Sequence, residues 1–534
     1  MEKLGSILLT NLLQLFQEFT KDFHPRYYMM VKLTNILDIV RKSVNGSSCR
    51  LERSRIGQFL TSARIARFMA SLFERQREHV RILDAGAGTG ALFAACVEAM
   101  VSGRYRPLSI LVVAYENDQK ILPYLKETME WCKSTCQKAG IPFQGEIRME
   151  DFIAAAIAQL EEGLFAVHRE RFTHVILNPP YKKISGESAT RQLLDAAGFE
   201  VSNLYAAFVW LSAKLLEPGG ELVAITLRSF CNGPYFRLFR IDLLNMMGLH
   251  RIHVFGSRKK AFGDDDVLQE NVIYHMVRGE RKPERLIVSS SEGADFDKSR
   301  SRSVPYDHVI SPGDRDAFIH LVLNDTDDRL MEKMEAFATS LVILGVDVST
   351  GRVVDFRAQE YLRYLPEEGT APLIYPCHFV SGFVSCPYES GKKPNAIAVS
   401  PQTKDLLLPV GYYVLTKRFS AKEEPRRVVA AIYDPKRVEA ALVGFENHLN
   451  YFHAKGKGLS ANLARGLALY LNSSLFDQYF RLFSGHTQVN ATDLRKMRYP
   501  SHEQLLRLGA HVKHQLPDQA TVDEILGKEC DIFG

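Results

Sequence analysis

Apolar side chains follow a helical spacing in the first clearly patterned part of the chain, residues 63–76. The members of this stripe recur at intervals of three and four residues: Ile65, Phe68, Met69, Leu72 and Phe73. That spacing places them on one face of a helix packed on a core. Thr61 or Ser62 can cap this helix, which leaves backbone N–H groups that suit a carboxylate.

From residue 80 to residue 279 the pattern alternates between strand-like and helical. The strand-like runs are 80–85, 109–118, 145–153, 172–177, 221–230, 250–256 and 270–279. Helical segments separate most of them, and this alternation predicts an α/β fold with a doubly wound, Rossmann-like sheet. The last two runs are joined by a basic loop instead of a helix, so the sheet is expected to close with an antiparallel pair.

The rest of the chain has a different pattern of apolar and polar residues. Residues 1–50 look helical and carry no obvious chemistry. Residues 51–288 hold the predicted sheet, and the polar stretch 289–308 lacks a hydrophobic period and is expected to be a linker. Residues 309–534 combine short strand-like runs with a helix at 466–483, which predicts a second, mixed α+β domain.

Composition limits the classes of protein that fit this pattern. A chain of 534 residues with 46% hydrophobic and 24% charged residues is expected to form two soluble globular domains. The net charge of +5 permits a polyanionic partner without requiring one. No apolar run approaches the roughly 18 residues that span a membrane. The eight cysteines are scattered, and Cys132 and Cys136 lack a second pair of ligands, so no metal site is expected.

The run 172–177 ends in the tetrapeptide Asn178-Pro179-Pro180-Tyr181. Prolines cannot donate to a sheet ladder, so this tetrapeptide should project from the carboxyl edge of the sheet, where open α/β sheets bind ligands. The side-chain carbonyl of Asn178 and the backbone carbonyl of Pro179 can accept both hydrogens of a planar exocyclic amine. Tyr181 adds a face on which an aromatic ring can stack.

Other strand ends carry groups that suit a nucleoside. Asp84 and the glycines of G-x-G-x-G follow the first strand: Gly86, Gly88 and Gly90. This spacing differs from the dinucleotide-binding fingerprint but allows close approach of backbone to a ligand. Glu116 ends the second strand, where an acid reaches ribose hydroxyls. Asp151 and Phe152 offer an acid and a ring to the edge and face of an adenine.

Together these segments resemble the gamma-class adenine-N6 DNA methyltransferases of bacterial type II restriction–modification systems, in which a catalytic domain precedes a target-recognition domain. The motifs appear between Gln58 and Gly279 as GQFLT, DAGAGTG, AYEND, EDFI, NPPY, LLEPGGELVAIT and a loop around Phe262. YLNSSLFDQYF and SGHTQVN are similar to parts of the recognition domain. The chain has Thr61-Ser62 where the family usually has Thr-Pro.

The resemblance implies a seven-stranded S-adenosylmethionine-dependent methyltransferase sheet and that cofactor. On this basis Thr61 and the glycine turn hold the methionine part, Glu116 the ribose, and Asp151 with Phe152 the adenine. It also implies a monomer in the cytoplasm that acts on double-stranded DNA at a specific sequence and works alongside a cognate restriction endonuclease. The target adenine would be flipped out of the duplex, with Tyr181 stacked on one face. Phe262 either closes the other face or serves only in packing.

Basic and amide-rich segments are candidates for DNA contact. Two clusters could bind phosphates or could be solvated faces: Arg258, Lys259 and Lys260, and Lys417, Arg418, Arg426 and Arg427. His486, Thr487, Gln488 and Asn490 could read base edges or could order the recognition domain.

Three rival functions can be compared with this prediction. Cytosine-C5 methylation needs a Pro-Cys nucleophile before a Glu-Asn-Val, but Pro376-Cys377 follows Glu270-Asn271-Val272 and lies outside the sheet domain. The same catalytic core could instead methylate RNA adenine or a protein glutamine, although such enzymes do not usually carry so large a second domain. A specificity subunit without catalysis would leave the register of the strand-end residues unexplained.

Overall fold

The computed structural model describes residues 60–161, 170–255 and 271–532, apart from 281, 313, 322, 389–391, 421–423, 439 and 484–487. The predicted N-terminal helical segment, residues 1–50, lies outside the described residues. The chain divides into two compact units after Ile319, and His320 begins the second unit. Each described helix is too short or too polar to cross a membrane.

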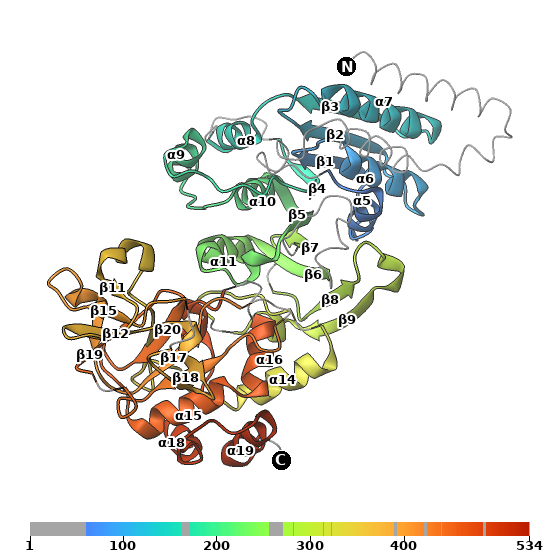
Figure 1. Cartoon of the computed structure of the whole chain (residues 1–534). Helices are drawn as coiled ribbons and strands as arrows, with labels where there is room; N and C mark the ends of the chain where they lie inside the picture. The colour runs from blue at the N-terminus through green and yellow to red at the C-terminus, as the bar shows by residue number, and fades with distance from the viewer. Residues whose placement is uncertain are drawn as a thin grey trace, which may run out of the picture. The chain divides into compact units, whose positions relative to one another are not determined.

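A nine-stranded sheet forms the centre of the first unit (Figure 1). Its order is β3 (Phe143–Arg148), β2 (Ser109–Tyr115), β1 (His79–Ala85), β4 (Phe172–Leu177), β5 (Leu216–Leu227), β7 (Asn271–Arg278), β6 (Met247–Phe255), β8 (Arg285–Ser291) and β9 (Arg300–Pro305). Strand β7 runs antiparallel to β5 and β6, and β9 runs antiparallel to β8, while the other neighbours are parallel. The predicted doubly wound sheet with its antiparallel pair is confirmed, and two further strands extend it.

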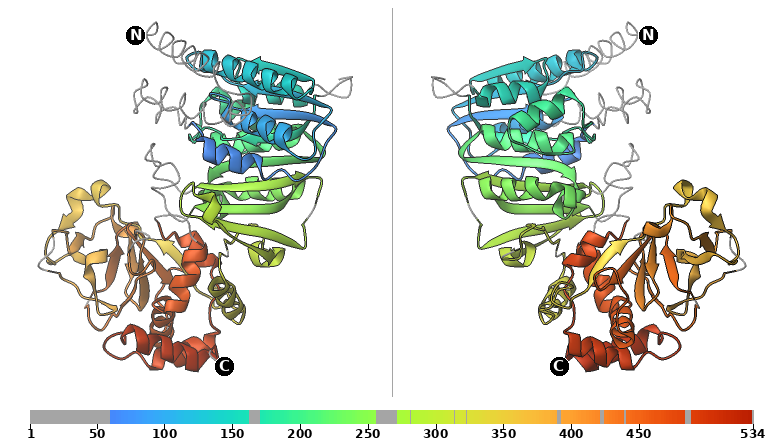
Figure 2. Two further views of the ribbon diagram at one scale, coloured as in Figure 1. Left: turned by 90° about the vertical axis from the view of Figure 1, so that its right-hand side faces the viewer. Right: turned by 90° about the vertical axis from the view of Figure 1, so that its left-hand side faces the viewer.

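Helices cover both faces of this sheet. On one face α5 (Ala63–Ala70), α6 (Ala91–Ser102) and α7 (Leu122–Lys138) pack in a row. On the other face lie α8 (Phe152–Glu161), α10 (Leu204–Leu215) and α11 (Arg237–Met246), with α9 (Ala189–Ala196) beside α8. Figure 2 shows the two faces from opposite sides. This winding brings the carboxyl ends of β1 to β4 to one edge.

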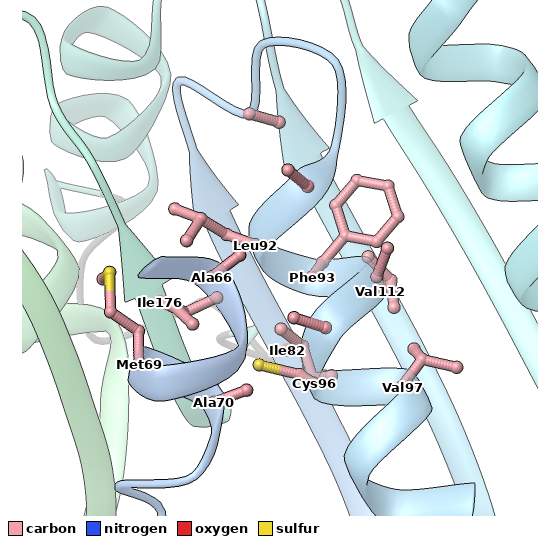
Figure 3. Packing of buried hydrophobic residues seen from close by; sticks show 14 of the residues in the cluster. Ala66, Met69, Ala70, Ile82, Leu92, Phe93, Cys96, Val97, Val112 and Ile176 are labelled. Carbon is pink, nitrogen blue, oxygen red and sulfur yellow. The ribbon is translucent and has the colours of Figure 1, made fainter. Parts of the chain in front are cut away.

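The core under α5 and α6 is built from the predicted helical stripe. Met69 of α5 is fully buried and packs with Ile82 of β1, Cys96 of α6 and Val112 of β2 (Figure 3). Ile65 of α5 is fully buried in the same cluster. Apolar burial of this kind contributes about 1.5–3 kcal/mol per large side chain. Helix α5 therefore has one well-defined position on the sheet, and its N-terminus is fixed with it.

The polar stretch 289–308 is not a linker, which corrects the prediction. Its first residues complete β8, and residues 300–305 form β9 at the edge of the sheet. The buried ring of His253 contacts the Ser289 and Ser291 hydroxyls, each at 2.9 Å. Buried serines paired with an imidazole, together with a solvent-facing edge strand, remove the hydrophobic period that would have revealed these strands.

A buried carboxylate ties the segment after α5 to the sheet. Glu221 of β5 accepts hydrogen bonds from the backbone N–H groups of Glu74 at 2.9 Å and Arg75 at 3.1 Å, and contacts His275 Nε2 at 2.8 Å. Burial acts to raise the pKa of Glu221, but these hydrogen bonds hold it below the ordinary value. Burial lowers the pKa of the neighbouring His174 to about 4, so that ring is neutral at pH 7.

Glu221→Ala is expected to destabilise the first unit by roughly 3 kcal/mol, because it leaves buried hydrogen-bond donors without an acceptor. The measurement is the midpoint of urea unfolding of the full chain. Glu217→Ala is the matched control: its partly exposed ion pair with Arg81, at 2.6 Å, should contribute less than about 1 kcal/mol. Equal losses from the two variants would contradict the assigned role of Glu221.

The second unit combines two sheets with a set of helices, as the predicted mixed α+β domain requires. One sheet has the order β10 (Asp347–Thr350), β20 (Leu449–His453), β17 (Tyr413–Lys417), β18 (Ala430–Tyr433), β14 (Phe383–Val384) and β13 (Phe379–Val380). The other has the order β11 (Leu362–Arg363), β15 (Ala396–Ala398), β12 (Thr370–Ile374), β19 (Leu442–Phe445) and β16 (Leu407–Pro409). The helices are α14 (Asp325–Glu335), α15 (Ala461–Leu471), α16 (Ser474–Phe483), α17 (Ala491–Lys496), α18 (His502–Ala510) and α19 (Gln519–Cys530).

The helix predicted at 466–483 is in fact two helices, α15 and α16. The break falls at Asn472, whose side chain accepts from the backbone N–H of Ala430 at 3.2 Å and donates to the carbonyl of the same residue at 2.9 Å. An asparagine that pairs with a neighbouring strand competes with continuation of the helix.

Candidate active site

A cavity of about 280 Å³ opens at the carboxyl ends of β1 to β4. Its walls include seven of the residues predicted to bind the cofactor: Thr61, Gly86, Gly88, Glu116, Asp151, Phe152 and Asn178. Pro180 of the tetrapeptide also lines it. Segments that are widely separated in the sequence thus meet at the sheet edge where a doubly wound fold binds ligands.

The glycine turn after β1 and the acid after β2 form one hydrogen-bonded unit. Gly86 and Gly88 have φ values of 77° and 57°, in the left-handed region that favours glycine. The N–H groups of Gly86 and Ala87 both donate to the carbonyl of Tyr115 at 2.9 Å. The Gly88 N–H donates to Glu116 Oε2 at 2.8 Å. The turn therefore positions the carboxylate, and the carboxylate in turn fixes the turn.

Glu116 is held on both of its oxygens. Its Oε1 accepts from the N–H groups of Asn117 at 2.8 Å and Asp118 at 2.9 Å, in addition to the Gly88 contact at Oε2. Only 6% of the residue is exposed. A carboxylate oxygen can accept more than one hydrogen bond, so Glu116 presents a fixed acceptor to a hydroxyl-bearing ligand in the cavity.

Two predicted cofactor residues lie behind the cavity wall and support the turn instead. Asp84 is fully buried, its Oδ2 accepts from the Phe93 N–H at 3.3 Å, and burial raises its pKa to about 8. Asp84 is therefore mostly protonated at pH 7. Gly90 precedes α6, where a Cβ would come within 2.6 Å of the Phe93 ring. Neither residue lines the cavity and both contact Phe93, so they help to shape the turn, while their role in cofactor binding stays a prediction.

An aromatic wall lines the cavity together with Glu150 and Asp151, the two acids that follow β3. The rings of Tyr115 and Phe208 each have their centroid 5.1 Å from that of Phe152. Phe208 comes from α10 and also packs against the glycine turn, because a Cβ on Gly86 would stand 3.6 Å from its ring. No sequence pattern singles out Phe208, since a phenylalanine in an apolar helix looks like core packing. The wall is suited to a flat heterocycle.

The amide of Asn178 is held at both ends. Its Nδ2 donates to Thr61 Oγ1 at 3.0 Å, and its Oδ1 accepts from the Tyr181 hydroxyl at 2.9 Å. Burial raises the pKa of that hydroxyl well above its ordinary value, so the group stays protonated and can donate. The Tyr181 hydroxyl also lies 3.2 Å from the Ile225 carbonyl, and its ring meets Tyr205 edge-on. The tetrapeptide is thus rigid in its side chains as well as in its prolines.

Comparison with known proteins assigns the chain to a family. Residues 108–262 match the Eco57I restriction-modification methylases. The chain is 43% identical over 504 residues to the type II methyltransferase M.PstI of Providencia stuartii, covering 94% of this chain and 98% of that one. It is 44% identical over 496 residues to the type II methyltransferase M.BsuBI of Bacillus subtilis, covering 92% and 97%. The chain belongs to the type II methyltransferases. It is therefore a DNA methyltransferase of the restriction–modification type.

A solved structure supports the fold of this type II methyltransferase along most of its length. A DrdV–DNA complex determined by cryo-electron microscopy aligns with 92% of this chain and 60% of that one, with a TM-score of 0.51 and 13% identity. Identity this low supports the fold alone.

The predicted DNA-contact residues of the type II methyltransferase separate into distinct groups. Arg427 is fully buried, and its Nε donates to Ser420 Oγ at 3.1 Å, while its backbone N–H donates to Asp477. The prediction that Arg427 contacts phosphate is therefore wrong, because the side chain is part of the core. Arg426 is half-buried and donates to the Ser473 carbonyl at 3.2 Å.

Other members of these groups stay predictions. Lys417 and Arg418 are half-buried, and Arg418 donates to the Asn447 carbonyl at 3.2 Å. Asn490 caps α17 and donates from Nδ2 to Asp493 at 3.2 Å, which favours an ordering role for it. The backbone of Gln488 forms an isolated antiparallel β-bridge with that of Phe419. The remaining candidates lie outside the described residues: Arg258, Lys259, Lys260, Phe262, His486 and Thr487.

Proposed function

We propose that this chain transfers a methyl group from S-adenosylmethionine to the N6 amine of an adenine that is flipped out of duplex DNA. The observation that carries the proposal is the Asn178 amide, fixed on the cavity wall and followed by the Pro179 carbonyl. The methylation would protect host DNA from a cognate restriction endonuclease, and the second unit would recognise the target sequence.

The residues of the cavity fit S-adenosylmethionine. Glu116 is a fixed acceptor for ribose hydroxyls, and the Tyr115, Phe152 and Phe208 wall with Asp151 suits the adenine ring. The glycine turn and the start of α5 leave backbone room for the methionine part. When bound, this cofactor supplies an electrophilic methyl group on a sulfonium sulfur.

The chain's own residues would then prepare the target amine. The nitrogen lone pair of an adenine amine is delocalised into the ring and is a weak nucleophile. Two carbonyl acceptors, Asn178 Oδ1 and the Pro179 carbonyl, would bind its two hydrogens and favour a pyramidal nitrogen whose lone pair faces the methyl group. Tyr181, anchored through its hydroxyl, would present its ring to the flipped base. Positioning of this kind accounts for a large part of enzymatic rate.

A cytosine-C5 route through Cys377 is not supported. That route needs a cysteine at the reacting base, and the described residues that line the cavity include none. Cys377 also belongs to the second unit, whereas the cavity belongs to the first.

The test is to identify the modified base. The full chain is expressed in a host without adenine methylation, and the purified protein is incubated with labelled S-adenosylmethionine and duplex DNA. We expect N6-methyladenine confined to one sequence, and no loss of activity in Cys377→Ser. Label in 5-methylcytosine, in RNA or in protein would contradict the proposal.

A further inference from the structure

The backbone N–H groups of the two residues that follow Asn178 cannot hold its side-chain amide. An asparagine side chain is often held by the backbone N–H groups of the residues that follow it. Here the next two residues are Pro179 and Pro180, which have no N–H to donate. The two halves of a side-chain amide are also nearly the same shape, so packing alone does not distinguish them.

Two hydroxyl groups contact the amide, one at its nitrogen and one at its oxygen. Thr61 Oγ1, from a segment 117 residues earlier in the chain, accepts from Nδ2 at 3.0 Å. The Tyr181 hydroxyl donates to Oδ1 at 2.9 Å. Thr61 is only 8% exposed and lines the same cavity as Asn178.

We infer that Thr61 is a positioning residue for methyl transfer, whose hydroxyl holds the Nδ2 end of the Asn178 amide and so keeps the Asn178 carbonyl turned toward the target amine. This inference rests on the proposed function. In the opposite orientation the NH₂ group of Asn178 would face the amine hydrogens, and two sets of donors would meet with no acceptor between them. An oriented acceptor is what the reaction needs, and Thr61 favours it before substrate arrives.

Thr61 can do this because the start of α5 is itself fixed. Ser62 caps the helix with a φ of −71°, a value that proline also adopts, so this backbone is compatible with serine and with the proline that the family usually has there. The Ser62 carbonyl accepts from the Ala66 N–H at 2.9 Å, and Ala66 is fully buried against the core. The hydroxyl is therefore held on a rigid element.

The experiment compares Thr61→Val with Thr61→Ser in the full chain. Valine matches threonine in shape but cannot accept the amide hydrogen, whereas serine keeps the hydroxyl. In single-turnover assays saturated with S-adenosylmethionine and DNA, Thr61→Val should slow transfer by about tenfold, the effect of one lost hydrogen bond. Thr61→Ser should stay within about twofold of the parent. The Kd for S-adenosylmethionine, measured by calorimetry, should change little in both variants.

Two further variants separate this role from a general disturbance of α5. Ser71→Ala removes the 2.7 Å hydrogen bond from the Ser71 hydroxyl to the Phe68 carbonyl at the other end of the helix, and should lower the melting temperature slightly while leaving the transfer rate unchanged. In an Asn178→Ala background, Thr61→Val should have no additional effect on the rate, because there is no amide left to orient.

Several outcomes would overturn the inference. One is a parental transfer rate in Thr61→Val; another is a loss of cofactor affinity whose effect disappears at saturation, which would make Thr61 a cofactor contact alone. In both of these outcomes the proposed function would stand, because the parent enzyme would still methylate DNA. A parent chain that transfers no methyl group would overturn the proposed function together with the inference.

Discussion

Asn178→Ala is expected to reduce single-turnover methyl transfer by roughly 10²–10³-fold, the usual cost of losing one oriented hydrogen-bond group in an active site. The variant removes the proposed side-chain acceptor for the target amine. The Tyr181 hydroxyl retains the Ile225 carbonyl as a partner, so the ring keeps its anchor. Affinity for DNA and for S-adenosylmethionine should therefore change little, and the loss should appear in the rate of the chemical step.

Asn203→Ala provides the matched control. This asparagine precedes α10, and its Nδ2 also donates to a hydroxyl, Ser202 Oγ, at 3.1 Å. Its removal should leave transfer within a few-fold of the parent. Asn178→Asp keeps an oxygen acceptor but loses the donor to Thr61, so an intermediate rate is expected. Near-parental transfer by Asn178→Ala would refute the amine-binding role.

Gly88→Asp is expected to abolish binding of S-adenosylmethionine. The backbone there has a φ of 57°, a Cβ would stand 3.0 Å from Leu60, and an aspartate would place a charge within the cavity beside Glu116. A ligand present at 100 times its Kd stabilises a protein by about 2.7 kcal/mol. The parent chain should show the corresponding rise in melting temperature with the cofactor, and the variant should show none.

Gly140→Asp is the control for backbone strain. Gly140 has a φ of 72°, follows α7 and has open space around its Cβ position. It should lose some stability but keep the thermal shift with S-adenosylmethionine. A shift of parental size in Gly88→Asp, or a strong shift with NAD in the parent, would contradict the assignment of the cavity.

The sequence predicted those residues of the candidate site that lie at the ends of strands. Gly86, Glu116, Asp151 and Asn178 each follow a recognisable apolar run, and parallel topology then brings them to one edge. Phe208 was missed because its position in the cavity depends on how α10 packs, and an apolar helix carries no mark of that.

The same limit applies to residues whose role depends on burial. Arg426 and Arg427 look alike in sequence, yet only the fold places Arg427 in the core. Likewise, Tyr181 was predicted as a stacking face, and its hydroxyl contact with Asn178 depends on a distance that no motif encodes. Seven strands were predicted from periodicity, whereas β8 and β9 were not. Leu286 and Val288 of β8 are buried, but the next buried positions are serines, and most of β9 faces solvent.

The polar composition of β9 has a consequence for solubility. A sheet with open ends exposes unpaired N–H and C=O groups that invite strands from other molecules, and charged side chains discourage such pairing. Arg300 and Arg302 stand on β9, and Glu146 and Arg148 stand on β3 at the opposite end. Any strand added from a second molecule would have to bury these charges. The stretch that resembles a linker in sequence therefore guards the sheet against edge-to-edge aggregation.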